Sequence, residues 1–200
     1  MNKMTKSFIA LAMASTFASP VFAASSWTAP AAGTTDATSA SVEWTGGVPI
    51  VVSGGYTKLT GLNGGAIAQG ELDVNMDGSF GSKAGSIGQV ITELHKYDAT
   101  NDVVEGLITS ADKATGVTWS VISAPIVTSS GLTDTSTAKA VLKASSALGQ
   151  TVMTTPVSGT ADELNRVTWT INSDKGGLLT DVNQGDTISV TAIVQAETSF

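Results

Sequence analysis

The chain has 200 residues, no cysteine, and a formal net charge of −7. This length predicts one domain or two small ones. An acidic chain whose single arginine is Arg166 is a poor partner for nucleic acid phosphates and for anionic lipid. Without cysteine, disulfides, thiolate metal sites and cysteine nucleophiles are excluded.

Residues 1–23 have the layout of a secretory signal peptide. Lys3 and Lys6 are followed by an apolar run over residues 8–14, and small residues lead up to Ala23. We expect cleavage after Ala23 and export of the remainder, which carries a net charge of −9. The alternative, an N-terminal membrane anchor, needs a longer apolar run.

Residues 24–40 form a tail rich in Ala, Ser and Thr with weak alternation. One register is mostly small or apolar and contains one glycine: Trp27, Ala29, Ala31, Gly33, Thr35 and Ala37. The other register holds Ser26, Thr28, Pro30, Ala32, Thr34 and Asp36. Such a tail is either disordered or a strand that pairs with an acceptor groove.

Residues 71–81 resemble the first half of an EF-hand loop, with Asp73, Asn75, Asp77 and Gly78 at the matching positions. The twelfth position is Ala84 instead of the bidentate Glu that calcium needs, and the preceding residues alternate as a strand does. We therefore predict a turn between strands, with a weak calcium site as the alternative. Residues 86–96 have helical spacing, with a strand from Gln89 as the alternative.

Apolar and polar residues alternate in four later segments, with glycines between them. The segments are residues 117–121, 138–144, 166–172 and 188–194. Short alternating strands with regular glycine-rich turns predict an all-β sandwich. We treat residues 24–200 as one domain with an extended N-terminus. The final strand is expected to leave an unpaired sheet edge, which is an association site.

Catalytic constellations are sparse. His95 is the only histidine, which disfavours both a serine triad and a zinc site. Asp98, Asp102 and the pair Asp162-Glu163 are carboxylates in polar, turn-like stretches, where solvated charge is the ordinary explanation. Trp119 and Trp169 lie on the apolar faces of their strands, which favours core packing over a sugar platform. We predict that the chain is not an enzyme and that it holds no metal or cofactor.

In layout, the sequence resembles the subunits of chaperone–usher fimbriae of Gram-negative bacteria, of a cysteine-free major pilin type. The resemblance rests on the signal peptide, the small-residue extension, the Ser/Thr/Gly/Ala-rich β-domain, and the alternating strand after Gly185 that ends on Phe200. It implies an incomplete immunoglobulin-like sandwich over residues 41–200, completed by a donor strand from the N-terminal extension, residues 24–40, of a neighbouring subunit. The implied donor residues are the Trp27–Ala37 register described above.

The resemblance also implies partners and a location. A periplasmic chaperone would pair first with the final strand, along an edge formed by Ile188, Val190, Ala192, Val194 and Phe200. An outer-membrane usher would then assemble identical subunits into a surface fimbria that supports attachment to host cells, with a tip adhesin and a host receptor as further partners. The alternatives are a monomeric secreted module that binds carbohydrate or calcium, and a secreted hydrolase.

Overall fold

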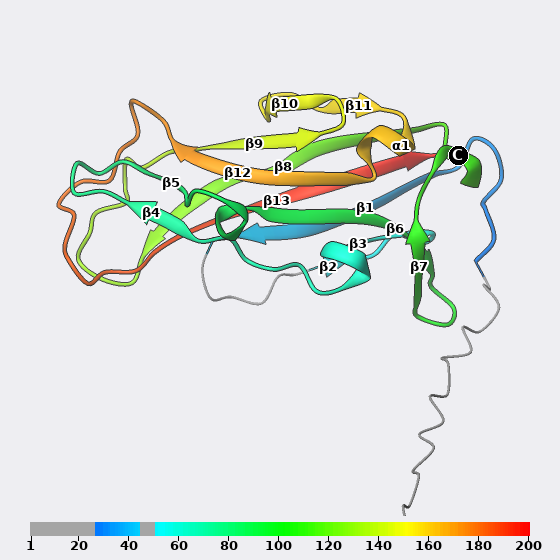
Figure 1. Ribbon diagram of the computed structural model, residues 1–200, viewed down its shortest axis with the longest axis horizontal. Helices are drawn as coiled ribbons and strands as arrows, with labels where there is room; N and C mark the ends of the chain where they lie inside the picture. The colour runs from blue at the N-terminus through cyan, green and yellow to red at the C-terminus, as the bar shows by residue number, and fades with distance from the viewer. Residues whose placement is uncertain (1–26, 45–50) are drawn as a thin grey trace, which may run out of the picture.

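The computed structural model describes residues 27–44 and 51–200, and these residues form two stacked β-sheets (Figure 1). The expected signal peptide lies outside the described residues. The first sheet has the order β11-β8-β13-β1-β2. Its strands are β1 (Thr35–Glu43), β2 (Val51–Val52), β8 (Gly116–Ser129), β11 (Val157–Gly159) and β13 (Ile188–Ser199).

The second sheet is built around β12 (Arg166–Ser173), which pairs with β9 (Ala140–Ser146), β6 (Val90–Asp98) and β5 (Phe80–Ser82). β6 also pairs with β3 (Thr57–Thr60) and β7 (Val103–Leu107). The outer strands are β10 (Gly149–Val152), beside β9, and β4 (Leu72–Val74), beside β5. Short helical turns connect the strands: η1 (Leu62–Gly64), η2 (Ser86–Gly88), η3 (Ser110–Asp112) and α1 (Ala161–Leu164).

The core lies between the sheets and is centred on two tryptophans. Trp119 of β8 and Trp169 of β12 meet edge to face, with ring centroids 5.4 Å apart. The Trp119 indole N–H donates to the Leu164 carbonyl at 2.9 Å, and the Trp169 indole N–H donates to the Thr92 hydroxyl at 2.8 Å. Buried indoles need such partners, because an unpaired N–H in an apolar interior is costly. The predicted packing of these two tryptophans is confirmed.

Three of the four alternating segments predicted as strands lie within β8, β12 and β13. The fourth, residues 138–144, overlaps β9 from Ala140 onward. The helix expected over residues 86–96 is wrong. η2 is a single turn and is followed by β6, as the alternative from Gln89 predicted. Val90, Thr92 and Leu94 are buried, whereas Ile87 is 50% exposed. Burial of every second residue is the pattern of a strand, whereas a helix would have buried Ile87 together with Val90 and Leu94.

None of the helices in the described ranges has the length and apolar character that crossing a membrane requires.

Candidate functional site

The pairing of β1 with β13 brings the N-terminal part of the described chain alongside its C-terminal strand. The two strands are antiparallel, from Thr35 opposite Ser199 to Glu43 opposite Thr191. The ladder extends beyond β1 through the Gly33 N–H, which donates to the Phe200 carbonyl at 2.6 Å. On its other side, β1 pairs with the two-residue strand β2, with Ser39 opposite Val52 and Ala40 opposite Val51. Figure 1 shows blue β1 running beside red β13.

β13 is therefore paired along both sides within one chain, because β8 lies on its other edge. The expected unpaired edge is wrong for the single chain, since β1 fills that place. All five residues expected to line this edge are at most 7% exposed: Ile188, Val190, Ala192, Val194 and Phe200. Their side chains face the core between the two sheets. β1 runs from Thr35 to Glu43 and so crosses the expected boundary between residues 40 and 41.

The face of β1 that points into the sandwich is the register that the sequence analysis did not choose. Thr38, Ala40 and Val42 are at most 1% exposed, and so is Trp44 just beyond the strand. The expected donor residues lie on the other register: Trp27 and Ala29 are half-buried, and Ala31, Gly33, Thr35 and Ala37 are exposed. The number of apolar residues favoured the register that points outward, because the inward face of β1 begins with an acidic residue, Asp36.

Asp36 is 7% exposed and its carboxylate is bound by a loop of the main body. Oδ1 accepts the Gly55 N–H at 2.6 Å, and Oδ2 accepts the N–H groups of Tyr56 and Thr57 at 3.1 and 2.7 Å. The Thr57 hydroxyl donates to Oδ2 at 2.6 Å. Four donors compensate the carboxylate for its lost water, so burial at this point is tolerated.

Thr38 makes the next contact along the same face. Its hydroxyl accepts the Leu59 N–H at 3.2 Å and donates to the Val52 carbonyl at 2.9 Å. Asp36 and Thr38 thus bind alternate N–H groups, those of Thr57 and Leu59, on the edge of β3 that β6 does not use. Polar side chains of β1 therefore satisfy a strand edge of the opposite sheet.

The segment before β1 also folds against the body. The Trp27 indole N–H donates to the Tyr56 carbonyl at 3.1 Å, and its backbone N–H donates to Glu105 Oε1 at 3.1 Å. The Lys96 ammonium lies 5.4 Å from the ring centroid of Trp27. This indole is consequently held at the surface, beside the β6–β7 hairpin.

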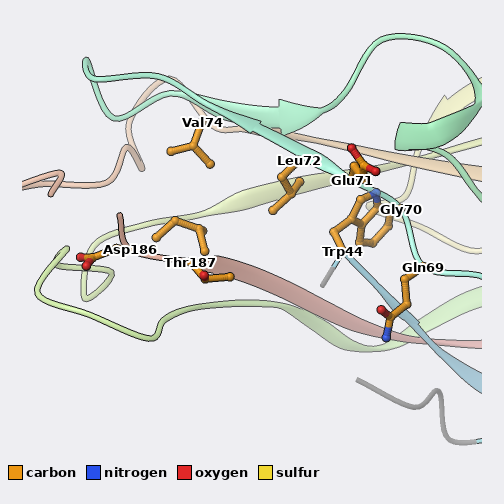
Figure 2. Close-up of a pocket in the computed structure, with 9 residues that line it drawn as sticks. Trp44, Gln69, Gly70, Glu71, Leu72, Val74, Asp186 and Thr187 are labelled. Carbon is orange, nitrogen blue, oxygen red and sulfur yellow. The ribbon is translucent and has the colours of Figure 1, made fainter. Parts of the chain in front are cut away.

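At the other end of β1, an open groove of about 510 Å³ lies between β4 and the start of β13 (Figure 2). Its lining includes Trp44, Leu72, Val74 and Ile188, together with the polar Glu71 and Asp186. Val74 is 39% exposed and Met76 is 63% exposed, so these two apolar side chains reach solvent. β4 has only three residues at the margin of its sheet, and little covers these side chains.

The turn predicted within residues 71–81 is confirmed as the connection between β4 and β5. The Asn75 N–H donates to the Ser79 carbonyl at 2.8 Å, and Gly78 has a φ of +84°. Hydrogen bonds from the Ser79 hydroxyl and N–H lower the pKa of Asp77. Both bonds go to Asp77 Oδ1. Within the described ranges, no three His, Cys, Asp or Glu side chains gather in a way that could hold a metal ion.

A buried charge cluster joins β6 to β12. Glu93 is 1% exposed, and its Oε1 accepts the Arg166 Nε–H at 2.7 Å. Oε2 accepts the Asn63 N–H at 2.6 Å and lies 3.1 Å from His95 Nε2. His95 Nδ1 lies 2.6 Å from the Glu105 carbonyl, so both ring nitrogens face acceptors. The only histidine is thus engaged in packing contacts between the strands.

Burial would raise the pKa of Glu93, but hydrogen bonds from His95, Arg166 and the Asn63 N–H outweigh it and lower the pKa. Sequence reasoning missed this cluster, because Arg166 is far from Glu93 in the chain. The available signal was that Glu93 and His95 share one face of a strand.

The other carboxylates considered for catalysis have local structural partners. Asp98 accepts the N–H groups of Thr100 and Asn101 in the β6–β7 turn. Glu163 accepts the Thr160 N–H at the start of α1. Asp102 binds Lys58 and Tyr97 at the surface. Asp162 and Glu163 both line an open pocket of about 320 Å³ beside Arg166, and the lining of that pocket does not include His95.

The comparisons with known proteins give no family: no family model, no curated protein and no solved structure matches this chain.

Proposed function

We propose that this protein is a structural subunit of an adhesive surface fimbria that polymerises by donor-strand exchange. In this proposal, β1 of one subunit takes the place beside β13 of the next. The observation that carries it is the position of β1 in the first sheet, directly beside β13. The donor becomes the segment from Gly33 to Trp44, which overlaps the residues 24–40 expected from the sequence.

The strand order supports an immunoglobulin-like sandwich. That fold has strands A, B, E and D in one sheet and C, F and G in the other. Here the order β9-β12-β6-β3 corresponds to D-E-B-A, and β8-β13 corresponds to C-F. The position of strand G, antiparallel to F, is filled by β1, which precedes every other strand in the described part of the chain. A strand supplied from the N-terminal side can equally come from a second copy.

The physical chemistry of β1 suits exchange. Its inward residues are small, and a strand of this kind fits a narrow groove between two sheets. Leaving the groove empty would expose Val190, Ala192 and Val194 together with unpaired backbone groups, which is costly in water. A periplasmic chaperone would cover this groove before an outer-membrane usher passes the subunit to the fibre. Attachment to host cells then belongs to the fibre or to a separate tip adhesin.

The test uses the absence of native cysteine. Ala37 and Glu197 face each other across the β1–β13 ladder, and both are exposed. We mix full-length chains carrying Ala37→Cys with chains carrying Glu197→Cys, warm them briefly, and oxidise. Disulfide-linked pairs of chains are expected, because an exchanged strand brings the two positions together.

The matched control replaces Glu197→Cys with Gln150→Cys, an exposed position on β10 in the other sheet. Equal cross-linking of the two mixtures would contradict strand exchange, since it would reflect random collision. Size separation of the linked species then distinguishes a closed reciprocal dimer from an open polymer.

A second candidate function is a monomeric secreted binding module. Two observations favour it: β1 pairs with β13 within one chain, and the groove of about 510 Å³ is a discrete surface site. It predicts no exchange between chains in the mixing experiment. It also predicts a change in the fluorescence of Trp44, which lines the groove, when a carbohydrate ligand binds.

A further inference from the structure

The contact between Asp36 and the loop from Gly54 to Thr57 joins the two sheets. Asp36 lies in β1 of the first sheet, whereas Thr57 begins β3, which pairs with β6 in the second sheet. The loop therefore belongs to the body of the protein, and only the carboxylate belongs to the N-terminal strand. Thr57 is fully buried, so its hydroxyl is fixed in this position.

The loop is shaped around the carboxylate. Three successive N–H groups, from Gly55 to Thr57, point at one anion, which is an arrangement that binds anions elsewhere in proteins. At Gly54, an added Cβ would lie 2.3 Å from Asp36 Oδ2, so no side chain fits there while the carboxylate is bound. The Gly54 N–H donates to the Thr57 carbonyl at 2.9 Å and closes the turn.

The remainder of the inward face of β1 specifies its register weakly. Thr38, Ala40 and Val42 are small residues of similar size. A slip by two residues keeps the same face inward and would exchange one small side chain for another. Asp36 resists such a slip, because it would move a carboxylate away from its four donors. Thr38 would lose its hydrogen bonds to Leu59 and Val52. Just beyond the strand, the buried Trp44 resists the slip as well, since its indole N–H donates to the Gly88 carbonyl at 3.0 Å.

We propose that the loop Gly54–Thr57 is a carboxylate receptor that fixes the register of the N-terminal strand beside β13, and that it accepts Asp36 from a second copy of this chain. The receptor recognises one acidic side chain at one position of a strand whose other inward residues are small and neutral. It therefore selects this chain's own N-terminal strand over a strand with a neutral residue at that position. The claim that the loop accepts Asp36 from a second copy rests on the proposed function. The claim that the loop fixes the register of β1 within one chain does not.

The register test uses disulfides within one full-length chain. Ala37→Cys is combined in turn with Gln195→Cys, Glu197→Cys and Ser199→Cys. Ala37 pairs with Glu197, and a slip of two residues brings it opposite position 195 or 199. With Asp36 intact, the disulfide to position 197 is expected to dominate. With Asp36→Asn, the yield of disulfides to positions 195 and 199 is expected to rise roughly tenfold relative to the yield of the disulfide to position 197. The reason is that the amide leaves donors of the receptor unpaired.

Two further variants complete the register test. Thr57→Val removes one donor and keeps the carboxylate, so it tests the receptor even where Asp36→Asn folds poorly; a rise of at least about threefold in the shifted disulfides is expected. Asp73→Asn, at an exposed acidic residue of β4, is the matched control and should leave the ratio unchanged. Ratios in Asp36→Asn and Thr57→Val equal to that control would overturn the receptor.

The selection test is made between chains. An acceptor with Glu197→Cys is offered equal amounts of two donors, both carrying Ala37→Cys and one also carrying Asp36→Asn. Capture of the Asp36 donor is expected to exceed the other by roughly tenfold. Equal capture of both donors would overturn the selection of Asp36 while leaving strand exchange standing. Capture of neither donor would overturn the proposed function. The register test within one chain would then still show whether the loop Gly54–Thr57 fixes the register of β1.

Discussion

A chain that begins at Val51 is expected to lose cooperative melting and to aggregate. It lacks β1, so β13 loses the partner along one edge, and the buried side chains of Ala40, Val42 and Trp44 are missing. Removing one buried tryptophan side chain alone costs about 3–5 kcal/mol, against about 5–15 kcal/mol for the stability of a whole domain. Thermal melting followed by circular dichroism makes the comparison with the full chain.

The same shortened chain should recover when residues 33–44 follow Phe200 through a short flexible linker. The Gly33 N–H lies 2.6 Å from the Phe200 carbonyl, so the two ends to be joined are adjacent. A fused segment carrying Val42→Asp is the matched control, because Val42 is fully buried and a charge there should prevent recovery. If the unfused chain melted cooperatively at the temperature of the full chain, β1 would not complete the fold.

Replacing Glu93 is expected to give the second large effect. Glu93→Leu leaves the Asn63 N–H and His95 Nε2 without their acceptor, while Arg166 can turn its half-exposed side chain to water. Breaking such a buried cluster costs about 3–5 kcal/mol. For a domain of this size, the melting temperature should fall by roughly 6–20 °C.

The control for Glu93 is Glu71→Leu, which removes an exposed ion pair with Lys83 at 2.9 Å. Exposed pairs contribute about 0–1 kcal/mol, so only a small change is expected. A Glu93→Leu variant that melted like the Glu71→Leu variant would show that the buried cluster does not stabilise the fold.

The Glu93 effect should depend on pH in a defined direction. The pKa of Glu93 is lowered in the folded protein, so its stabilising effect is complete above the usual glutamate value of about 4.3. This stabilisation is lost as the pH falls through the lowered pKa that Glu93 has in the folded protein. The difference in unfolding free energy between the parent and Glu93→Leu should therefore shrink below about pH 4. A difference that stayed constant down to pH 2 would contradict this assignment.

Local pattern in the sequence was sufficient for the strands with one clearly apolar face. Val117 and Trp119 of β8, and Val167, Trp169 and Ile171 of β12, alternate strictly and are buried. Burial on one face imposes a period of two, and that period is visible without any knowledge of the partners. The β4–β5 turn was likewise predictable, because Asp77-Gly78 favours such a turn through its own chemistry.

Long-range partners decided what the sequence could not show. Asp36 looks like a solvent-facing residue until Gly55, Tyr56 and Thr57 supply its hydrogen bonds. Glu93 looks equally exposed until Arg166 meets it from β12. Both carboxylates are buried because donors distant in the chain compensate them, and one sequence carries no periodic signal of such compensation.

The pairing of β1 with β13 has a consequence for the rate of folding. β1 precedes and β13 follows every other described strand, so their ladder closes one of the longest loops that the chain can form. Contacts between residues so distant in the chain form slowly. Until β13 has formed, the edge of β1 that pairs with it has no partner strand from its own chain. The speed of closure therefore sets how long that edge of β1 stays unpaired.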